Sequence, residues 1–179
     1  MDRTLLSKDK LKQLRVLLYA TSLLPGANAE VGVYRGGVAK LISLLCPDKD
    51  LYIFDTFCGI LGSTEADYHK NGEFACSREE VVRFIGFDKL HVYEGLFPDS
   101  IGTDELPEFS FVHSDTDTYL GTKATLDVFL PKMVAGGIIL FDDWLWPNCP
   151  GVTTVLSEYV VPNGYKYDSY GHQLWITKL

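Results

Sequence analysis

The chain is short of positive charge. Its 179 residues include 16 Lys or Arg against 24 Asp or Glu, and the formal net charge is −8. The Lys and Arg residues are not grouped into a basic block. Because nucleic-acid binding depends on cationic side chains gathered against phosphates, this balance argues against a nucleic-acid partner and favours a small-molecule ligand.

Cysteine is scarce and scattered. The four cysteines are Cys46, Cys58, Cys76 and Cys149, and no two of them form a Cys-x-x-Cys pair. This spacing argues against zinc ligation and against a thioredoxin-like redox centre. Reduced thiols are the expected state.

Long apolar runs are absent as well. No stretch approaches the roughly 18 uninterrupted apolar residues of a membrane-spanning helix. Residues 1–12 are polar and carry no apolar signal core, so we expect a cytoplasmic protein with no membrane contact. With 46% hydrophobic residues the chain can bury one sizeable core, and residues 1–179 are predicted to form a single domain.

Apolar runs alternate with helical patterns along the sequence. A leading helix is predicted around residues 11–18. The strands then predicted are 27–33, 51–54, 90–93, 109–113 and 137–141, and the helices are 38–46, 77–85, 118–130 and 152–160. The alternation predicts right-handed crossovers and a mostly parallel sheet covered by helices on both faces. Residues 165–168 and 173–177 are predicted to add a terminal antiparallel hairpin.

A glycine-containing turn follows the first predicted strand, between Glu30 and Gly37. Glycine at such a turn lets a ligand approach the backbone closely. The order of Gly32, Gly36 and Gly37 does not satisfy Gly-x-Gly-x-x-Gly, and no Lys-Ser or Lys-Thr follows, so the dinucleotide and P-loop signatures are both missing. An NAD-dependent oxidoreductase is disfavoured on the same ground.

Two acidic side chains bracket this turn. Glu30 precedes it, and a carboxylate there suits a cationic or amino-bearing ligand because it would repel phosphate oxygens. Asp55 ends the second predicted strand, where an acid can accept hydrogen bonds from both ribose hydroxyls. The pair favours S-adenosylmethionine as the ligand. Structural glycines with a solvated acid are the alternative interpretation.

Aspartates follow two further predicted strands. Asp115 and Asp117 come after the fourth strand, and Asp142 and Asp143 come after the fifth. Ligands of open α/β sheets collect at the carboxyl ends of the strands, and carboxylates gathered there repel one another without a cation. The clusters therefore predict a divalent metal site with oxygen ligands. The alternatives are solvated turn aspartates and, for Asp117, an N-cap of the following helix.

Residues 56–76 form a long connection that contains several glycines. Long loops are uncommon in compact domains and are often functional, so an active-site lid is one interpretation. A disordered surface loop is the other, and the sequence does not separate the two.

Six stretches resemble, in the same order, the TylF/macrocin O-methyltransferase family, a class I S-adenosylmethionine-dependent group that methylates sugar hydroxyls of natural products. They are LLPGANAEVGVYRGG, YIFDTFCGI, YEGLFPDS, SDTDTYLGT, LPKMVAGGIILFDDW and WPNCPGV. The resemblance covers most of the chain. It implies a Rossmann-like, doubly wound α/β fold with a seven-stranded sheet of order 3-2-1-4-5-7-6, mostly parallel with one antiparallel strand.

The same resemblance implies roles for individual residues. Those that would hold the methionine end of the cofactor are Glu30, Gly32, Tyr34, Arg35 and Gly36. Asp55 would bind the ribose, and Phe57 and Gly95 would contact the adenosine. Asp115 would lie near the reactive end.

By the resemblance, Asp115, Asp142 and Asp143 would bind Mg²⁺ and Asp117 would act as the general base. The predicted activity is magnesium-dependent O-methylation of a sugar or polyol hydroxyl. A metal-independent methyltransferase and a non-catalytic S-adenosylmethionine-binding or interaction module are the alternatives. The identity of the acceptor and the formation of a homo-oligomer stay open.

Overall fold

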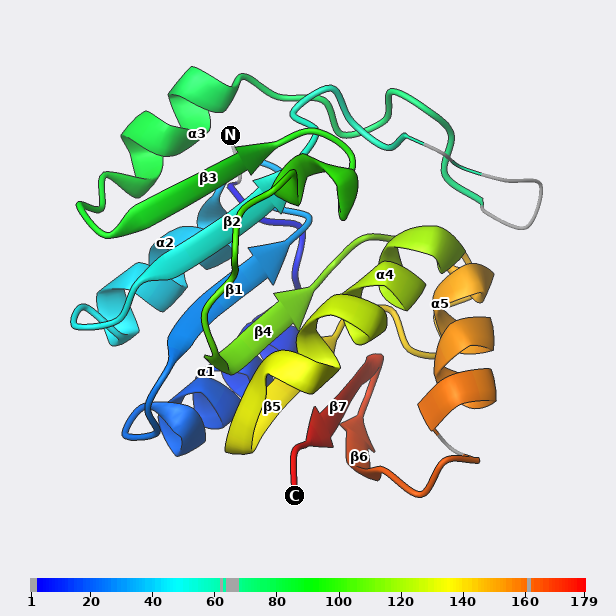
Figure 1. Ribbon diagram of the computed structural model, residues 1–179. Helices are drawn as coiled ribbons and strands as arrows, with labels where there is room; N and C mark the ends of the chain where they lie inside the picture. The colour runs from blue at the N-terminus through cyan, green and yellow to red at the C-terminus, as the bar shows by residue number, and fades with distance from the viewer. Residues whose placement is uncertain (1–2, 62, 64–67, 161) are drawn as a thin grey trace.

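The computed structural model describes residues 3–61, 63, 68–160 and 162–179. Its centre is a seven-stranded sheet in the order β3-β2-β1-β4-β5-β7-β6 (Figure 1). The strands are β1 (Ala27–Val31), β2 (Leu51–Asp55), β3 (Leu90–Glu94), β4 (Phe109–Ser114), β5 (Met133–Phe141), β6 (Lys166–Tyr170) and β7 (Gln173–Thr177). β7 runs antiparallel to both of its neighbours, and the other pairs are parallel. The predicted fold class is confirmed.

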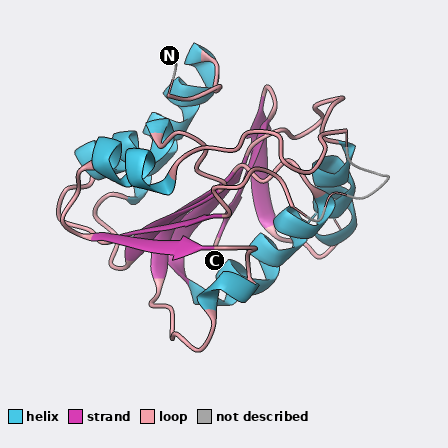
Figure 2. Cartoon of the chain, turned by 90° about the horizontal axis from the view of Figure 1, so that it is seen from above, coloured by secondary structure: helices cyan, strands magenta, loops and turns pink. Residues whose placement is uncertain are grey.

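Helices cover both faces of the sheet. α1 (Lys8–Thr21), α2 (Gly37–Leu45) and α3 (Arg78–Ile85) lie on one face, and α4 (Tyr119–Phe129) and α5 (Pro150–Val155) lie on the other (Figures 1 and 2). Shorter segments are the 3₁₀ helices η1 (Asp99–Ile101) and η2 (Leu130–Lys132) and the π-helix η3 (Leu156–Val160). In the part of the chain that the structure describes, no helix is long and apolar enough to cross a membrane.

The core has two apolar clusters, one on each face of the sheet. Phe129 of α4 and Val155 of α5 belong to one cluster, and Leu14 of α1 and Ile42 of α2 belong to the other. The central strands β1 and β4 are buried along their whole length. Because helices cover both of their faces, these strands appear in the sequence as nearly continuous apolar runs.

Side-chain caps set where three helices begin. Ser7, Ser77 and Thr118 precede α1, α3 and α4, and each accepts a hydrogen bond from the backbone N–H three residues later. The cap of α4 is therefore Thr118, and the alternative interpretation of Asp117 as the cap is wrong. Asp117 has a φ of 60°, in the left-handed region rather than the extended region of a cap residue.

β5 begins at Met133, earlier than the predicted start at residue 137. Phe109 pairs with Met133 and Phe111 pairs with Ile138, so the register between β4 and β5 shifts at this point. The irregular pairing extends β5 over residues 133–136, which the apolar pattern of the sequence does not mark as strand.

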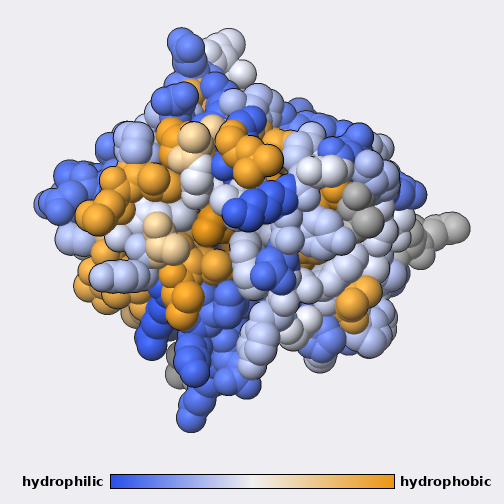
Figure 3. Space-filling view, turned by 90° about the horizontal axis from the view of Figure 1, so that it is seen from below, coloured by the Kyte–Doolittle hydropathy of each residue, from blue (hydrophilic) through white to orange (hydrophobic). Residues whose placement is uncertain are grey.

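The two ends of the sheet differ in character. Figure 3 views the molecule from the end where the parallel strands begin, and apolar side chains gather on that surface. The exposed apolar residues in the helices and turns that lead into β1 and β2 include Tyr19, Leu23, Leu44 and Leu45. The glycine turn and the aspartates lie at the opposite end, where the strands finish.

Candidate active site

A cavity of about 720 Å³ lies at the carboxyl ends of β1, β2, β4 and β5. Most residues predicted to bind cofactor or metal line it: Glu30, Gly32, Tyr34, Asp55, Gly95, Asp115, Asp117, Asp142 and Asp143. Three predicted cofactor residues, Arg35, Gly36 and Phe57, are not in its lining. The fold therefore brings the glycine turn, the second-strand acid and both aspartate clusters to one place.

Gly32 sits where β1 and β4 end side by side. Its φ is +82°, and a Cβ built on it would lie 2.1 Å from the carbonyl oxygen of Asp115. The N–H of Asp115 in turn donates to the carbonyl of Val31 at 2.9 Å. A side chain at Gly32 would push the Asp115 backbone away, so this glycine fixes how closely the turn and the first aspartate cluster approach.

Asp55 holds two loops in position. One carboxylate oxygen, Oδ2, accepts hydrogen bonds from the backbone N–H groups of Val33 at 2.6 Å and Tyr34 at 3.0 Å. The other oxygen, Oδ1, accepts from the N–H of Phe57 at 2.7 Å. Asp55 thus joins the turn after β1 to the loop after β2, and its predicted contact with a ribose would use the remaining lone pairs of the same carboxylate.

Glu30 is a buried acid that lies beside His113. Its side chain is 2% exposed, and Oε1 lies 3.2 Å from Nδ1 of His113. Burial raises the pKa of Glu30, and the hydrogen bond and charge of His113 oppose that rise. Oε2 of Glu30 has no hydrogen-bond partner among the described residues. A ligand ammonium at the cavity wall would satisfy this oxygen.

The three predicted cofactor residues outside the lining have other surroundings. The guanidinium of Arg35 lies over the ring of Tyr34, 4.9 Å from its centroid. Gly36 caps α2 with a φ of 80°. Phe57 is 5% exposed and packs with the cluster beneath α1 and α2. Cofactor contacts from these three residues stay predictions without support from the cavity wall.

The side chains of Asp115, Asp142 and Asp143 converge. Each offers one carboxylate oxygen, and the three atoms lie within 4.8 Å of one another. Burial, followed by repulsion from Asp142, raises the pKa of Asp115 well above its ordinary value. Burial and the charge of Asp143 raise the pKa of Asp142. Acids that resist joint ionisation are stabilised by a cation placed between them.

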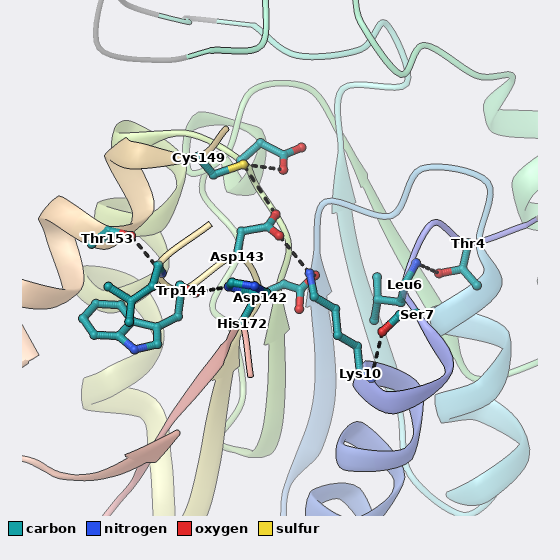
Figure 4. Close-up of polar contacts among 12 residues, drawn as sticks. Thr4, Leu6, Ser7, Lys10, Asp142, Asp143, Trp144, Cys149, Thr153 and His172 are labelled. Carbon is teal, nitrogen blue, oxygen red and sulfur yellow. Dashed lines mark hydrogen bonds and ion pairs between the residues drawn. The ribbon is translucent and has the colours of Figure 1, made fainter. Parts of the chain in front are cut away.

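Lys10 supplies a positive charge to this cluster. Its Nζ lies 2.7 Å from Oδ2 of Asp142 and 2.9 Å from Oδ1 of Asp143 (Figure 4). Burial alone would lower the pKa of Lys10, but the two carboxylates raise it above its usual value. Sequence reasoning missed Lys10. The two aspartates that it contacts lie 132 and 133 positions later in the chain, and no sequence pattern links one lysine of a helix to residues so far away.

The residues before α1 form one side of the cavity. Its lining includes Arg3, Thr4, Leu5 and Leu6. The carbonyl of Arg3 accepts a hydrogen bond from the N–H of Gly37 at 3.0 Å, and a Cβ on Gly37 would lie 2.5 Å from that carbonyl oxygen. Gly37 therefore admits the chain's own N-terminal segment rather than a ligand.

Asp117 lies beside Cys149. The thiol Sγ of Cys149 donates to Oδ1 of Asp117 at 3.4 Å and to Oδ2 of Asp143 at 3.6 Å. Burial and then the contact with Asp143 raise the pKa of Asp117 to about 8. A carboxylate whose pKa lies near neutral pH is suited to accept a proton.

Asp117, Asp143 and Leu145 all have positive φ, and such strained conformations concentrate at functional sites.

The 56–76 connection borders the cavity. Its residues in the lining are Thr56, Gly59, Ile60, Leu61, His69 and Phe74. Backbone hydrogen bonds between Ile60 and Glu73 and between Cys76 and Phe57 draw its two halves together. Residues 62 and 64–67 of the connection lie outside the described residues. This location agrees with the interpretation as a lid, and closure of the lid stays a prediction.

Two solved methyltransferase structures are similar to the chain in fold. The O-methyltransferase NovP is 23% identical, the match covers 99% of this chain and 83% of that one, and the TM-score is 0.85. The calicheamicin methyltransferase CalS11 is 20% identical over 96% of this chain and 80% of that one, with a TM-score of 0.75. The sheet order and these likenesses define a Rossmann-like fold of the methyltransferase type.

The family follows from the sequence match. Residues 1–162 match the family model described as Macrocin-O-methyltransferase (TylF). The chain belongs to this TylF family, which confirms the family identified from the six sequence stretches.

Curated relatives of the chain are longer proteins. The demethyldecarbamoylnovobiocin O-methyltransferase of Streptomyces niveus is 30% identical over 154 residues, which cover 75% of this chain and 58% of that relative. The mycinamicin III 3''-O-methyltransferase of Micromonospora griseorubida is 23% identical over 146 residues, covering 70% of this chain and 58% of that relative. The chain therefore spans less than two thirds of the length of these relatives.

Proposed function

We propose that the protein is an S-adenosylmethionine-dependent, magnesium-dependent O-methyltransferase that acts on a hydroxyl of a sugar or polyol-type small molecule, and that residues 1–179 form one domain. The observation that carries the proposal is the convergence of the glycine turn and the aspartate cluster on one cavity. The names of the two curated relatives support the reaction type, because both specify O-methyl transfer.

The glycine-turn side of the cavity would hold S-adenosylmethionine. The unpartnered Oε2 of Glu30 suits the amino group of the cofactor, and Asp55 lies at the strand end where a ribose is held in related folds. Gly95 lines the same side of the cavity and has a φ of 130°. Because it is a glycine, no side chain blocks the nucleoside there. A Bacillus cereus O-methyltransferase of the same fold, 15% identical with a TM-score of 0.68, was solved in complex with SAH.

The donors at Asp115, Asp142 and Asp143 fit a magnesium ion. All three ligand atoms are carboxylate oxygens, which Mg²⁺ prefers. Oδ1 of Asp142 is buried and has no hydrogen-bond partner among the described residues, so the cluster has a free acceptor for a cation. Magnesium bound to these residues would lower the pKa of a coordinated hydroxyl.

The remaining chemistry belongs to the chain itself. Asp117 would accept the proton of the acceptor hydroxyl at a carboxylate oxygen, because its raised pKa of about 8 makes it basic near neutral pH. The N-terminal segment and the 56–76 connection would limit water in the cavity. Holding the acceptor oxygen in line with the methyl group, about 3 Å away, would supply several kcal/mol of the rate acceleration.

A sugar or related polyol is the proposed class of acceptor. A third relative, 24% identical over 145 residues, is a Streptomyces olivaceus 4'-O-methyltransferase whose name specifies a dimethoxy-rhamnosyl tetracenomycin as substrate. Beyond the acids, the cavity wall includes Leu5, Leu120 and Trp146. The indole of Trp146 offers an apolar face against which the carbon skeleton of such a substrate can pack.

A metal-independent methyltransferase is the second candidate, and Lys10 favours it. The ammonium already contacts Asp142 and Asp143, where a divalent ion would otherwise balance their charge. In this version Lys10 replaces the divalent ion as the permanent cation of the site. Methyl transfer that is unchanged by a chelator would identify the second candidate.

Calorimetry of S-adenosylmethionine binding, with and without Mg²⁺, tests the proposed function. The wild type is expected to bind, and Asp55→Ala is expected to bind much more weakly because the turn after β1 loses its anchor. The Asp142→Ala/Asp143→Ala double variant should bind the cofactor but transfer no methyl group to a panel of sugars and polyols. Asp88→Ala, at an exposed position, is the control. No binding by the wild type in either condition would refute the proposal.

A further inference from the structure

His69, Asp117 and Cys149 bring three different donor atoms together beside the aspartate cluster. Each residue offers one ligand atom, a nitrogen, an oxygen and a sulfur, and these atoms lie within 4.8 Å of one another. They come from three segments: the 56–76 connection, the loop after β4 and the turn before α5. We propose that these side chains form a second cation site, which takes a transition-metal ion of the zinc class.

The donor set distinguishes this site from the magnesium-type cluster. Asp115, Asp142 and Asp143 supply oxygen alone. Thiolate sulfur and imidazole nitrogen are instead the ligands that Zn²⁺ and related ions prefer. Three protein ligands are also typical of zinc sites that keep a further position for water. The oxygen-only cluster would therefore bind Mg²⁺, and the neighbouring site with nitrogen and sulfur ligands would bind an ion of the zinc class.

The surroundings of His69 match those of a metal-binding histidine. Its Nδ1 lies 2.9 Å from Oε2 of Glu73, which leaves Nε2 available to a ligand. A carboxylate on the second ring nitrogen fixes the tautomer and the orientation of histidines that bind metal. The rings of Tyr68 and Phe74 lie edge-on to the imidazole, with centroid distances of 5.2 and 5.1 Å. The histidine is thus held before any ion arrives.

Cys149 is buried, yet its sulfur faces polar atoms. The residue is 1% exposed, and Sγ contacts a carboxylate oxygen of Asp117. Sγ also contacts a carboxylate oxygen of Asp143 (Figure 4). A cysteine that only fills space behaves as a small apolar side chain and needs no such partners. A metal ion in place of the thiol proton would be attracted by both carboxylates, and cysteine loses its proton when it binds metal.

An ion in this site would tie the 56–76 connection to the sheet. His69 belongs to that connection, whereas Asp117 follows β4 and Cys149 precedes α5. The ion would hold the connection over the cavity and would occupy an oxygen of Asp117. Inhibition of methyl transfer by Zn²⁺ is therefore expected, and this consequence rests on the proposed function, while binding of the ion does not.

Cobalt(II) is the probe that tests the site, because a thiolate ligand gives Co²⁺ a near-ultraviolet charge-transfer band that nitrogen and oxygen ligands do not. The 179-residue chain is titrated with Co²⁺ in excess Mg²⁺, which keeps the oxygen-only cluster occupied. The wild type is expected to bind one Co²⁺ with the thiolate band. Cys149→Ser should lose the band, and His69→Ala should weaken binding at least about tenfold. Cys58→Ser removes an exposed thiol of the same connection and should change neither.

A Co²⁺ complex without the thiolate band, or a band that persists in Cys149→Ser, would overturn the proposal. Circular dichroism checks the fold of each variant. If Cys149→Ser does not fold, His69→Ala decides, because His69 lies in the connection and outside both apolar clusters. Unchanged Co²⁺ affinity in His69→Ala overturns the site, and the tenfold loss supports it.

Discussion

At the scale of single residues, surroundings rather than residue type separate the roles of the acids. Asp142 contacts the ammonium of Lys10, whereas Asp117 contacts the thiol of Cys149. Burial raises the pKa of both, and the hydrogen bond with Asp143 brings the pKa of Asp117 to about 8, whereas the charge of Lys10 opposes the rise in the pKa of Asp142. One aspartate is therefore arranged to face a cation and the other to exchange a proton near neutral pH.

Replacing Lys10 tests its competition with a divalent ion. Lys10→Met is expected to bind Mn²⁺ about tenfold more tightly than the wild type, because the ion no longer displaces an ammonium held by hydrogen bonds worth about 1.5 kcal/mol. Electron paramagnetic resonance of free Mn²⁺ measures the affinity. Lys12→Met, at an exposed position of the same helix, is the matched control. Equal affinities in all three proteins would contradict the competition.

Replacing Asp117 tests its role as the base. Asp117→Asn is expected to lower kcat by about 10²- to 10⁴-fold, the usual contribution of a general base, while S-adenosylmethionine binding is kept. The wild-type rate should rise with pH while Asp117 loses its proton, up to a pKa of about 8, and a bound cation should move that rise to lower pH. Steady-state kinetics across pH measure both effects, and an unchanged pH profile in the variant would argue for another base.

At the scale of elements, the site depends on close contact between strand ends. β1 and β4 finish next to one another, and Gly32 lies against the backbone of Asp115. Asp55 then fastens the turn after β1 to the loop after β2 through three backbone N–H groups. Small displacements of one strand end are thus passed to the predicted cofactor and metal residues together.

Adding one methyl group at Gly32 tests this contact. Gly32→Ala is expected to destabilise the fold by on the order of 3 kcal/mol, because the Cβ would lie 2.1 Å from a backbone oxygen at a φ of +82°. Gly164→Ala has a φ of +70° and no atom within 4 Å of its Cβ, so about 1 kcal/mol is expected there. Urea denaturation gives both values. Equal losses would mean that backbone conformation alone, and not the approach of β4, requires glycine at position 32.

At the scale of the whole molecule, buried acids make stability depend on pH. The folded state holds protons on Asp115, Asp117 and Asp142 that the unfolded chain releases, because burial raises all three pKa values. A folded state that binds more protons than the unfolded one loses stability as pH rises. For Asp117 this loss extends from its ordinary pKa of 3.8 to about 8.

A divalent ion should reduce this pH dependence. In chelator, the melting temperature of the protein is expected to fall as pH rises within the window from 3.8 to about 8. With Mg²⁺ the fall should be smaller, because a bound cation stabilises the ionised acids and binds the folded state in preference. Thermal melts at several pH values measure the difference. A melting temperature that falls equally with and without Mg²⁺ would contradict ion binding at the aspartates.

The sequence by itself determined the sheet and the end at which the site lies. The spacing of apolar residues and the positions of turn residues indicate each strand and helix locally. The handedness of crossovers then restricts how successive strands can be placed in the sheet. Because parallel strands end at one edge, Glu30, Asp55, Asp115 and Asp142 could be assigned to a common site before the structure was known. The sequence alone can predict the role of a residue when that role depends on its position at the end of a strand.

The tertiary structure alone decided which side chains meet across long separations. Lys10 reaches Asp142, and His69, Asp117 and Cys149 converge, although no spacing in the sequence relates them. The scattered cysteines argued against zinc ligation, because single donors from separate segments leave no local pattern. Contacts of this kind depend on how helices and loops pack around the sheet, and packing is a property of the folded chain rather than of any segment.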